Sequence, residues 1–261
     1  SRGNRARPWA LCRKGKTDVR FLFTTFEGGG HVPPAILMAS ALARRGHDIL
    51  FVSDEANRAA VRAEGLEFAP WRSAPSRQRT GQADDPLQDW RRRWPPAVVR
   101  AVCDAVASGP ASAYAHDTQA FIGDFAPDLV VTNELLLGCM VACEATHTPC
   151  ALLTGNLWPY PTRLDQPPFG PGWGPPRGRA AERAHESARA MIETWFDAGL
   201  APLNAARARF GLAPLAKALD QTLTARVVVL GASRAFDYES ASPPPFVYAG
   251  PLIDLPAPAT A

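Results

Sequence analysis

The stretch VRFLFTTFEGGGHVPPAILMASALARRGHDILFVS, residues 19–53, decides the fold of this chain. Apart from Arg20, residues 19–25 are apolar, β-branched or aromatic, which is typical of a buried parallel strand. Three glycines and a histidine follow, and two prolines then begin a helical apolar pattern that we expect to end at Gly46. A second strand over residues 48–53 completes a strand, loop, helix and strand unit, for which a right-handed crossover is expected.

The glycine loop of this unit lies where the carboxyl end of a strand meets the start of a helix, the place where open α/β sheets bind ligands. Glycine lets the backbone adopt positive φ and lets a ligand approach closely. His31 follows the loop, and the positive end of a helix dipole favours its neutral imidazole, which can accept a proton. The plainer alternative is a tight turn in which His31 only caps the helix.

The remaining sequence continues the alternation of strands and helices. Short apolar runs predict further strands at residues 66–71, 129–132, 150–154, 226–231 and 246–248. Helical patterns separate most of these runs, and a Gly-Pro pair at 109–110 is expected to divide the helix over residues 95–125. The order predicts a Rossmann-like, doubly wound α/β domain with a mostly parallel sheet of six or seven strands.

Composition excludes several classes of protein. The chain of 261 residues is 46% hydrophobic and 20% charged, which is typical of a globular domain, and its net charge of +3 is too small to indicate nucleic-acid binding. Its five cysteines contain no CxxC pair, so we expect free thiols and a cytoplasmic location rather than a metal site. No apolar run has transmembrane length, which argues against an integral membrane protein.

Several polar residues outside the glycine loop are expected to have structural roles or to face solvent. Asp54 is expected to cap a helix over residues 55–64, and Gly65 to end it. His116 and Asp117 are expected on the surface, because adjacent residues of a helix do not share a face. The charged segment 72–95 is expected to be a solvated loop, with a phosphate or acceptor contact as the sharper alternative.

A long segment at residues 155–178 is rich in proline and glycine and carries Trp158, Tyr160 and Phe169. Proline stiffens such a loop and glycine allows it to turn, while aromatic rings supply contact area for a flat apolar molecule. Loops of this length in compact domains are often functional. The alternative is a surface cover that packs its own rings.

These motifs together resemble the N-terminal half of bacterial GT-B glycosyltransferases, enzymes that transfer a sugar from a nucleotide sugar to small lipophilic molecules. The resemblance spans about residues 19–255, and the matching segments are FLFTT (21–25), GGGHVPP (28–34), ALARRGHDI (41–49), FVS (51–53), LEF (66–68), PDLVV (127–131) and FVYAGPL (246–252). It implies an acceptor-binding domain over residues 18–250 and the start of an interdomain linker over 251–261, with the C-terminal donor domain absent. Residues 1–17 are basic and without a periodic pattern, so we expect them to form a disordered tail.

The resemblance also implies roles for individual residues. His31 would remove the proton from an acceptor hydroxyl, which then displaces the nucleoside diphosphate with inversion at the anomeric carbon. Many relatives orient this histidine with an aspartate at the end of the fourth strand, where this chain has Asn133, with Glu134 beside it. Asparagine can fix a tautomer but carries no charge to stabilise the imidazolium, so Glu134 is the alternative partner.

The substrates implied by the resemblance are a small-molecule acceptor and a UDP- or dTDP-hexose bound through the missing domain, with no cofactor and no metal. We expect an apolar acceptor pocket next to His31, lined by Trp158, Tyr160 and Phe169. The full set of expected substrate-binding residues is Phe26, Gly28, Gly29, Gly30, Trp94, Asn156, Trp158, Tyr160 and Phe169.

Two other functions compete with sugar transfer. A stand-alone, non-catalytic small-molecule binding module could be built on the same half-fold. A nicotinamide-dependent oxidoreductase would need the fingerprint Gly-x-Gly-x-x-Gly, in which the third glycine permits close packing of helix on strand. Pro33 occupies that third position here, which argues against a dinucleotide site.

Overall fold

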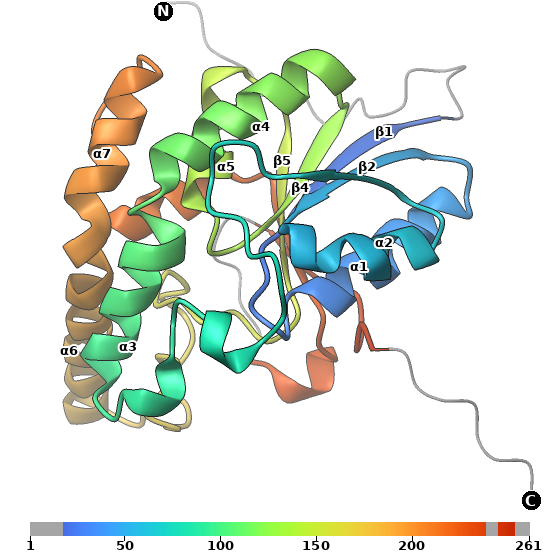
Figure 1. Cartoon of the computed structure of the whole chain (residues 1–261). Helices are drawn as coiled ribbons and strands as arrows, with labels where there is room; N and C mark the ends of the chain where they lie inside the picture. The colour runs from blue at the N-terminus through green and yellow to red at the C-terminus, as the bar shows by residue number, and fades with distance from the viewer. Residues whose placement is uncertain (1–17, 239–244, 254–261) are drawn as a thin grey trace, which may run out of the picture.

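The computed structural model describes residues 18–238 and 245–253 and contains one parallel seven-stranded sheet (Figure 1). The strands pair in the order β3-β2-β1-β4-β5-β6-β7, and every neighbouring pair is parallel. Their bounds are β1 Arg20–Thr24, β2 Asp48–Ser53, β3 Glu67–Pro70, β4 Leu129–Asn133, β5 Cys150–Thr154, β6 Val227–Leu230 and β7 Phe246–Tyr248. The predicted fold class is therefore confirmed.

Helices cover both faces of this sheet, with α1 and α2 on one side and α4, α5 and α7 on the other (Figure 1). The α-helices are α1 Val32–Ala43, α2 Arg58–Ala63, α3 Pro95–Val102, α4 Ala111–Phe125, α5 Leu137–Ala145, α6 Arg179–Phe196 and α7 Leu200–Arg209. A π-helical turn at Cys103–Ala107 continues α3, and non-helical residues 108–110 then separate it from α4, so the predicted division near residue 109 is confirmed. None of the described helices is long and apolar enough to cross a membrane.

Each central strand contributes to two hydrophobic cores because successive side chains point to opposite faces of a sheet. In β1, Leu22 packs in the core beneath α4 and α5, while Phe23 packs in the core beneath α1. Val130 and Val131 of β4 divide in the same way. Burial on both faces explains why these strands are continuous apolar runs in the sequence.

The strand order reverses direction between β1 and β4. From β1 the chain proceeds through β2 to β3 on one side, whereas β4, β5, β6 and β7 extend the sheet on the other. This is the topological switch point of a doubly wound sheet, where the loops after the two central strands diverge and leave a crevice. The glycine loop after β1 and Asn133 at the end of β4 both lie at this edge.

Some expected boundaries and contacts differ from the structure. Helix α1 ends at Ala43 rather than near Gly46, which has a φ of +85° in the turn that follows. Asp54 precedes a short 3₁₀ turn but makes no capping hydrogen bond with its side chain. Its buried carboxylate instead accepts hydrogen bonds from the backbone N–H groups of Glu27 and Arg77, at 2.8 and 2.7 Å. Asp54 thus ties the glycine loop to the segment after β3.

The expectation that Asp117 is a surface residue is wrong. Its side chain is fully buried and accepts hydrogen bonds from the backbone N–H groups of Arg72, Ser73 and Ala74 and from the Ser73 hydroxyl. His116 beside it is exposed, as expected. Helix periodicity does not reveal this contact, because it depends on a distant turn that packs against α4.

The expected tail over residues 1–17 and most of the expected linker over 251–261 lie outside the described residues. The charged segment at 72–95 forms two short 3₁₀ turns, Gln82–Asp84 and Asp89–Arg91, joined by irregular backbone. The proline- and glycine-rich segment after β5 contains no helix or strand.

Candidate active site

The glycine loop has a backbone shape that other residues would disturb. Gly29 has a φ of +68°, a conformation that favours glycine. A Cβ at Gly28 would lie 2.6 Å from the ring of Phe26, and the N–H of Gly30 donates to the Gly28 carbonyl at 2.9 Å. The tight turn delivers His31 to the first position before α1, and its side chain makes no capping hydrogen bond. The interpretation of His31 as only a helix cap is therefore wrong.

His31 instead meets the end of β4, across 102 residues of sequence. The Nδ2 atom of Asn133 lies 3.0 Å from His31 Nδ1 and 2.7 Å from Glu134 Oε2. The Oδ1 atom of Asn133 accepts the backbone N–H of Leu135 at 2.9 Å. Glu134 also approaches the histidine directly, with Oε1 at 3.8 Å from Nδ1. The structure thus brings His31, Asn133 and Glu134 into one cluster.

Burial sets the protonation of this cluster. Removal from water disfavours charged forms, and it lowers the pKa of His31, so the ring is neutral near pH 7. The Glu134 side chain is only 4% exposed, and burial raises its pKa to about 7, although a hydrogen bond from the Thr154 side chain opposes the rise. A carboxyl with such a pKa can exist in either protonation state at neutral pH, which suits proton transfer.

A cavity of about 540 Å³, here called the switch-point cavity, opens beside His31 and Glu134. Its other lining residues are mostly apolar: Val98, Val99, Val102, Leu135, Thr154, Asn156, Leu157, Pro159, Tyr160, Phe169 and Phe196. Small-molecule sites commonly combine apolar walls with a few placed polar groups. The size and lining of the cavity suit a flat, largely apolar molecule with a polar group directed at His31.

Three of the expected binding residues line the switch-point cavity. Tyr160 is buried, and its hydroxyl donates to the backbone carbonyl of Glu134 at 3.2 Å. Phe169 is about half exposed and lies at the solvent side of the lining, and Asn156 contributes an exposed amide. The proline- and glycine-rich segment therefore forms one wall of the cavity.

Other expected binding residues lie elsewhere. Trp158 is buried, stacks edge-on against Tyr160 and Phe246, and donates its Nε1–H to the Thr162 hydroxyl at 2.8 Å. Trp158 does not line the cavity; its ring packs against Tyr160, which does, and against Phe246 of β7. Trp94 is 69% exposed at the start of α3, where its side chain faces solvent.

The residues around the glycine loop also lie outside the lining of the switch-point cavity. Phe26 contacts the catalytic candidate directly, with its ring centroid 5.0 Å from that of His31. Gly29 borders a separate groove along α1, and the loop glycines shape the backbone before His31. In this structure these residues position His31, and their contact with an acceptor stays a prediction.

Sequence reasoning missed the wall formed by α3 and α6. Val98, Val99 and Val102 belong to a predicted amphipathic helix, and Phe196 ends another. The helical pattern shows that these residues share an apolar face, but not that this face borders the site. A cavity wall and a packed core give the same periodicity.

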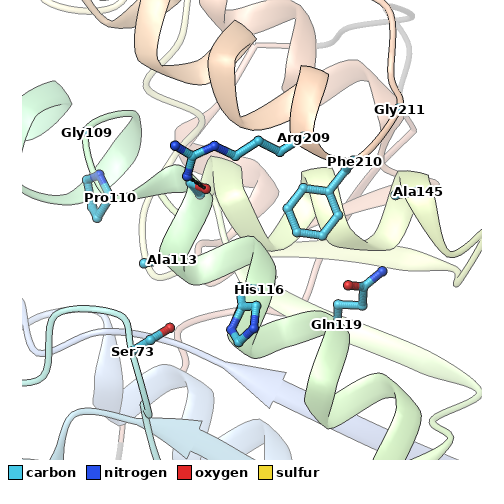
Figure 2. A pocket seen from close by; sticks show the side chains of 11 residues that line it. Ser73, Gly109, Pro110, Ala113, His116, Gln119, Ala145, Arg209, Phe210 and Gly211 are labelled. Atoms are coloured by element: carbon cyan, nitrogen blue, oxygen red, sulfur yellow. Dashed lines mark hydrogen bonds between the residues drawn. The ribbon is translucent and has the colours of Figure 1, made fainter.

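A larger cavity of about 950 Å³ lies on the outer helices, between α4 and the end of α7 (Figure 2). Arg209 extends across it and donates to the Ser112 hydroxyl at 2.8 Å, and His116 lies on its α4 side. Its lining residues include no carboxylate. The smaller switch-point cavity is the better candidate because His31 and Glu134 converge on it. Among the described residues no group of His, Cys, Asp and Glu could hold a metal ion.

Comparison with known proteins agrees with this fold. No family model matches the chain. The 4'-demethylrebeccamycin synthase of Lentzea aerocolonigenes is 26% identical over 244 residues, which make up 92% of this chain and 57% of the relative. The solved glycotransferase of kitacinnamycin superposes with a TM-score of 0.63 at 14% identity, over 93% of this chain and 54% of its own.

Two further solved structures extend the comparison. The calicheamicin glycosyltransferase CalG4 has a TM-score of 0.56 at 17% identity and is matched over 53% of its length, with 90% of this chain covered. The glycosyltransferase VinC, solved with dTDP, has a TM-score of 0.55 at 18% identity, with 88% of this chain and 52% of VinC covered.

The fold is that of one half of a GT-B glycosyltransferase, and the chain spans about half the length of the proteins it matches. Its relatives within that class are bacterial glycosyltransferases of natural-product biosynthesis. The resemblance inferred from the sequence motifs is thereby confirmed.

Proposed function

We propose that this chain is the acceptor-binding half of an inverting glycosyltransferase, which transfers a hexose to a hydroxyl group of a small lipophilic acceptor. The observation that carries the proposal is the position of His31. Its imidazole lies at the switch point, held by Asn133 at 3.0 Å, and borders the apolar switch-point cavity. A hydroxyl group on a molecule in that cavity can approach a neutral imidazole while the rest of the molecule contacts apolar walls.

The reaction in this proposal is a single displacement. The proton of the acceptor hydroxyl moves to His31 as the oxygen attacks the anomeric carbon of the sugar. The bond between that carbon and the diphosphate oxygen breaks, and the nucleoside diphosphate leaves with the electron pair. Attack opposite the leaving group inverts the configuration, and general-base assistance of this kind contributes ~10²–10⁴-fold to rate.

The donor in the proposal is a UDP- or dTDP-hexose bound chiefly by a second GT-B domain. VinC was solved with dTDP, and this chain matches only 57% of the synthase and 52% of VinC, which supports both points. No cofactor or metal enters the proposed step, because the nucleotide sugar is itself the activated substrate. The four described cysteines are buried free thiols, and a cytoplasmic location stays a prediction.

Acceptor binding can be tested on this chain alone. Val99 borders the switch-point cavity, so Val99→Phe should fill part of it and weaken binding of aromatic aglycones, measured by calorimetry against a panel of phenols and aliphatic alcohols. Trp94→Phe is the matched control, since Trp94 faces solvent outside the cavity, and it should bind like the unaltered chain. Equal affinity of all three proteins would place the acceptor elsewhere.

Transfer requires the donor half. The chain, mixed with or fused to the C-terminal half of a GT-B relative, should glycosylate a bound acceptor in the presence of UDP- or dTDP-hexose, with the product detected by mass spectrometry. Turnover that needs both halves and is lost in His31→Ala supports the enzyme. Tight acceptor binding without transfer under any donor supplement would favour the non-catalytic binding module.

A further inference from the structure

The amide of Asn133 has one orientation that satisfies all its partners. The backbone N–H of Leu135 donates to Oδ1, so the NH₂ group must face His31 Nδ1 and Glu134 Oε2. Turning the amide over would set NH₂ against the N–H of Leu135 and set Oδ1 against the Glu134 carboxylate. Asparagine side-chain orientation is assigned from such a network, and here every contact favours the same choice.

This orientation determines where His31 carries its proton. A nitrogen that accepts a hydrogen bond must hold a lone pair, and neutral imidazole has one N–H and one lone pair. Because Nδ1 of His31 accepts from Asn133, the ring proton is on Nε2. A protonated Nε2 cannot take a proton from a hydroxyl group. An aspartate in place of Asn133 would accept from Nδ1–H and leave the lone pair on Nε2, and the wrong tautomer costs a serine protease ~10⁴-fold in kcat.

Glu134 is placed to reverse this tautomer. Its Oε1 atom lies 3.8 Å from His31 Nδ1, about 1 Å beyond the ~2.8 Å of a charge-assisted hydrogen bond, while Oε2 stays bonded to Asn133. Apart from His31, the titratable side chain of the cavity that faces Glu134 is Tyr160, whose hydroxyl is occupied by the Glu134 carbonyl. The walls from α3 and α6 contribute apolar residues, and β5 contributes Thr154.

We propose that Asn133 locks resting His31 in the tautomer with the proton on Nε2, and that Glu134 is the positioning carboxylate that releases this lock. When Glu134 moves onto Nδ1, the proton on Nε2 exchanges to solvent and another binds Nδ1, which leaves the number of ring protons unchanged. Nε2 then has the lone pair that accepts the substrate proton, and Glu134 stabilises the imidazolium. This inference rests on the proposed function for its purpose, but the tautomer itself is a property of this chain.

The tautomer can be measured directly by two-bond ¹H–¹⁵N correlation NMR of the ¹⁵N-histidine-labelled chain at pH 8. The His31 signals are identified by their loss in His31→Ala. We expect Nδ1 to be of the unprotonated type and Nε2 to be protonated. A protonated Nδ1 in the unaltered chain would overturn the lock.

Variants test the two residues separately. Asn133→Ala removes the lock and should give protonated Nδ1 as Glu134 takes the vacated place. Asn133→Ala combined with Glu134→Ala, which leaves no side-chain acceptor for Nδ1–H at either position, should not. If Asn133→Ala keeps the proton on Nε2, Glu134 has no such role and the proposal fails. Asn133→Asp retains an acceptor for the N–H of Leu135, which helps it to fold, and should also shift the proton to Nδ1. Glu186→Gln, an exposed change on α6, should match the unaltered chain.

Failure here is distinguishable from failure of the proposed function, because the NMR experiment needs neither donor nor acceptor. If NMR shows the proton on Nε2 but the chain transfers no sugar, the inference about the tautomer stands and the proposed glycosyltransferase function is refuted. If the chain transfers sugar and its resting His31 has a protonated Nδ1, the proposed function is supported and the inference about the tautomer is refuted.

Discussion

The replacement Glu134→Gln should change how the stability of this domain depends on pH. The folded protein holds the Glu134 proton tightly because the carboxyl is buried, with a pKa of about 7 against an ordinary value of 4.5. At ~1.4 kcal/mol for each pH unit, this difference corresponds to ~3 kcal/mol of folding free energy. The contribution is fully present below pH 4.5 and is lost as the pH rises through about 7, because the buried charge must then form. Glutamine has no charge to form.

The measurement is the free energy of unfolding in urea, followed by tryptophan fluorescence, at several pH values between 4.5 and 8.5. The stability of Glu134→Gln relative to the unaltered chain should rise by ~3 kcal/mol across this range. Other titrating groups, such as the buried Asp54, cancel in the comparison, and the exposed Glu186→Gln should run parallel to the unaltered chain. A difference between Glu134→Gln and the unaltered chain that is constant with pH would show that Glu134 titrates normally, and would refute the reasoning from burial.

Further predictions concern the cluster and the fold. In the completed enzyme, His31→Ala should lower transfer to aliphatic alcohols by ~10²–10⁴-fold and to the more acidic phenols by less, in an initial-rate assay; full turnover on an alcohol would make His31 structural. Asn133→Asp should keep or raise the transfer rate, because the new aspartate and Glu134 share one proton and the carboxylate that stays ionised accepts a hydrogen bond from His31 Nδ1–H. A large loss of transfer rate would contradict the tautomer argument. The transfer rate of the unaltered enzyme should rise as the pH passes about 7, when Glu134 ionises, and a rise complete below pH 6 would exclude that carboxylate. Asp117→Ala should lower the free energy of unfolding by ~2–4 kcal/mol, since it leaves buried N–H groups unpaired; urea unfolding with an unchanged midpoint would refute the structural role.

The strands and the location of the site were predictable because they depend on local pattern and on topology. Doubly buried strands are continuous apolar runs, and parallel strands bring their carboxyl ends to one edge, so the glycine loop and Asn133 had to be neighbours if β1 and β4 paired. Side-chain direction in irregular segments was not predictable. The turns around Pro159 decide that Tyr160 lines the cavity while Trp158 packs behind it, and no periodicity encodes those turns.

Longer-range contacts were also beyond the sequence. Asp117 is buried because the turn at residues 72–74 folds onto α4, and helix periodicity contains no information about a turn that far away. The amide orientation of Asn133 depends on a backbone N–H two residues later and on a neighbouring carboxylate. The sequence placed the right residue types in the cluster, but the direction of their hydrogen bonds needed three-dimensional geometry.

The walls of the switch-point cavity and the residues proposed to transfer the proton lie on different elements of the fold. Asn133 ends the central strand β4, Glu134 follows it, and His31 lies directly before α1, whereas α3 and the segment after β5 form walls of the cavity. Substitutions at Val98 or Phe169 should therefore change the shape of the cavity without displacing His31, Asn133 or Glu134. Proteins with this arrangement can therefore evolve to bind different small molecules while His31, Asn133 and Glu134 stay the same. A mutant library designed to change small-molecule binding can be restricted to α3 and the segment after β5.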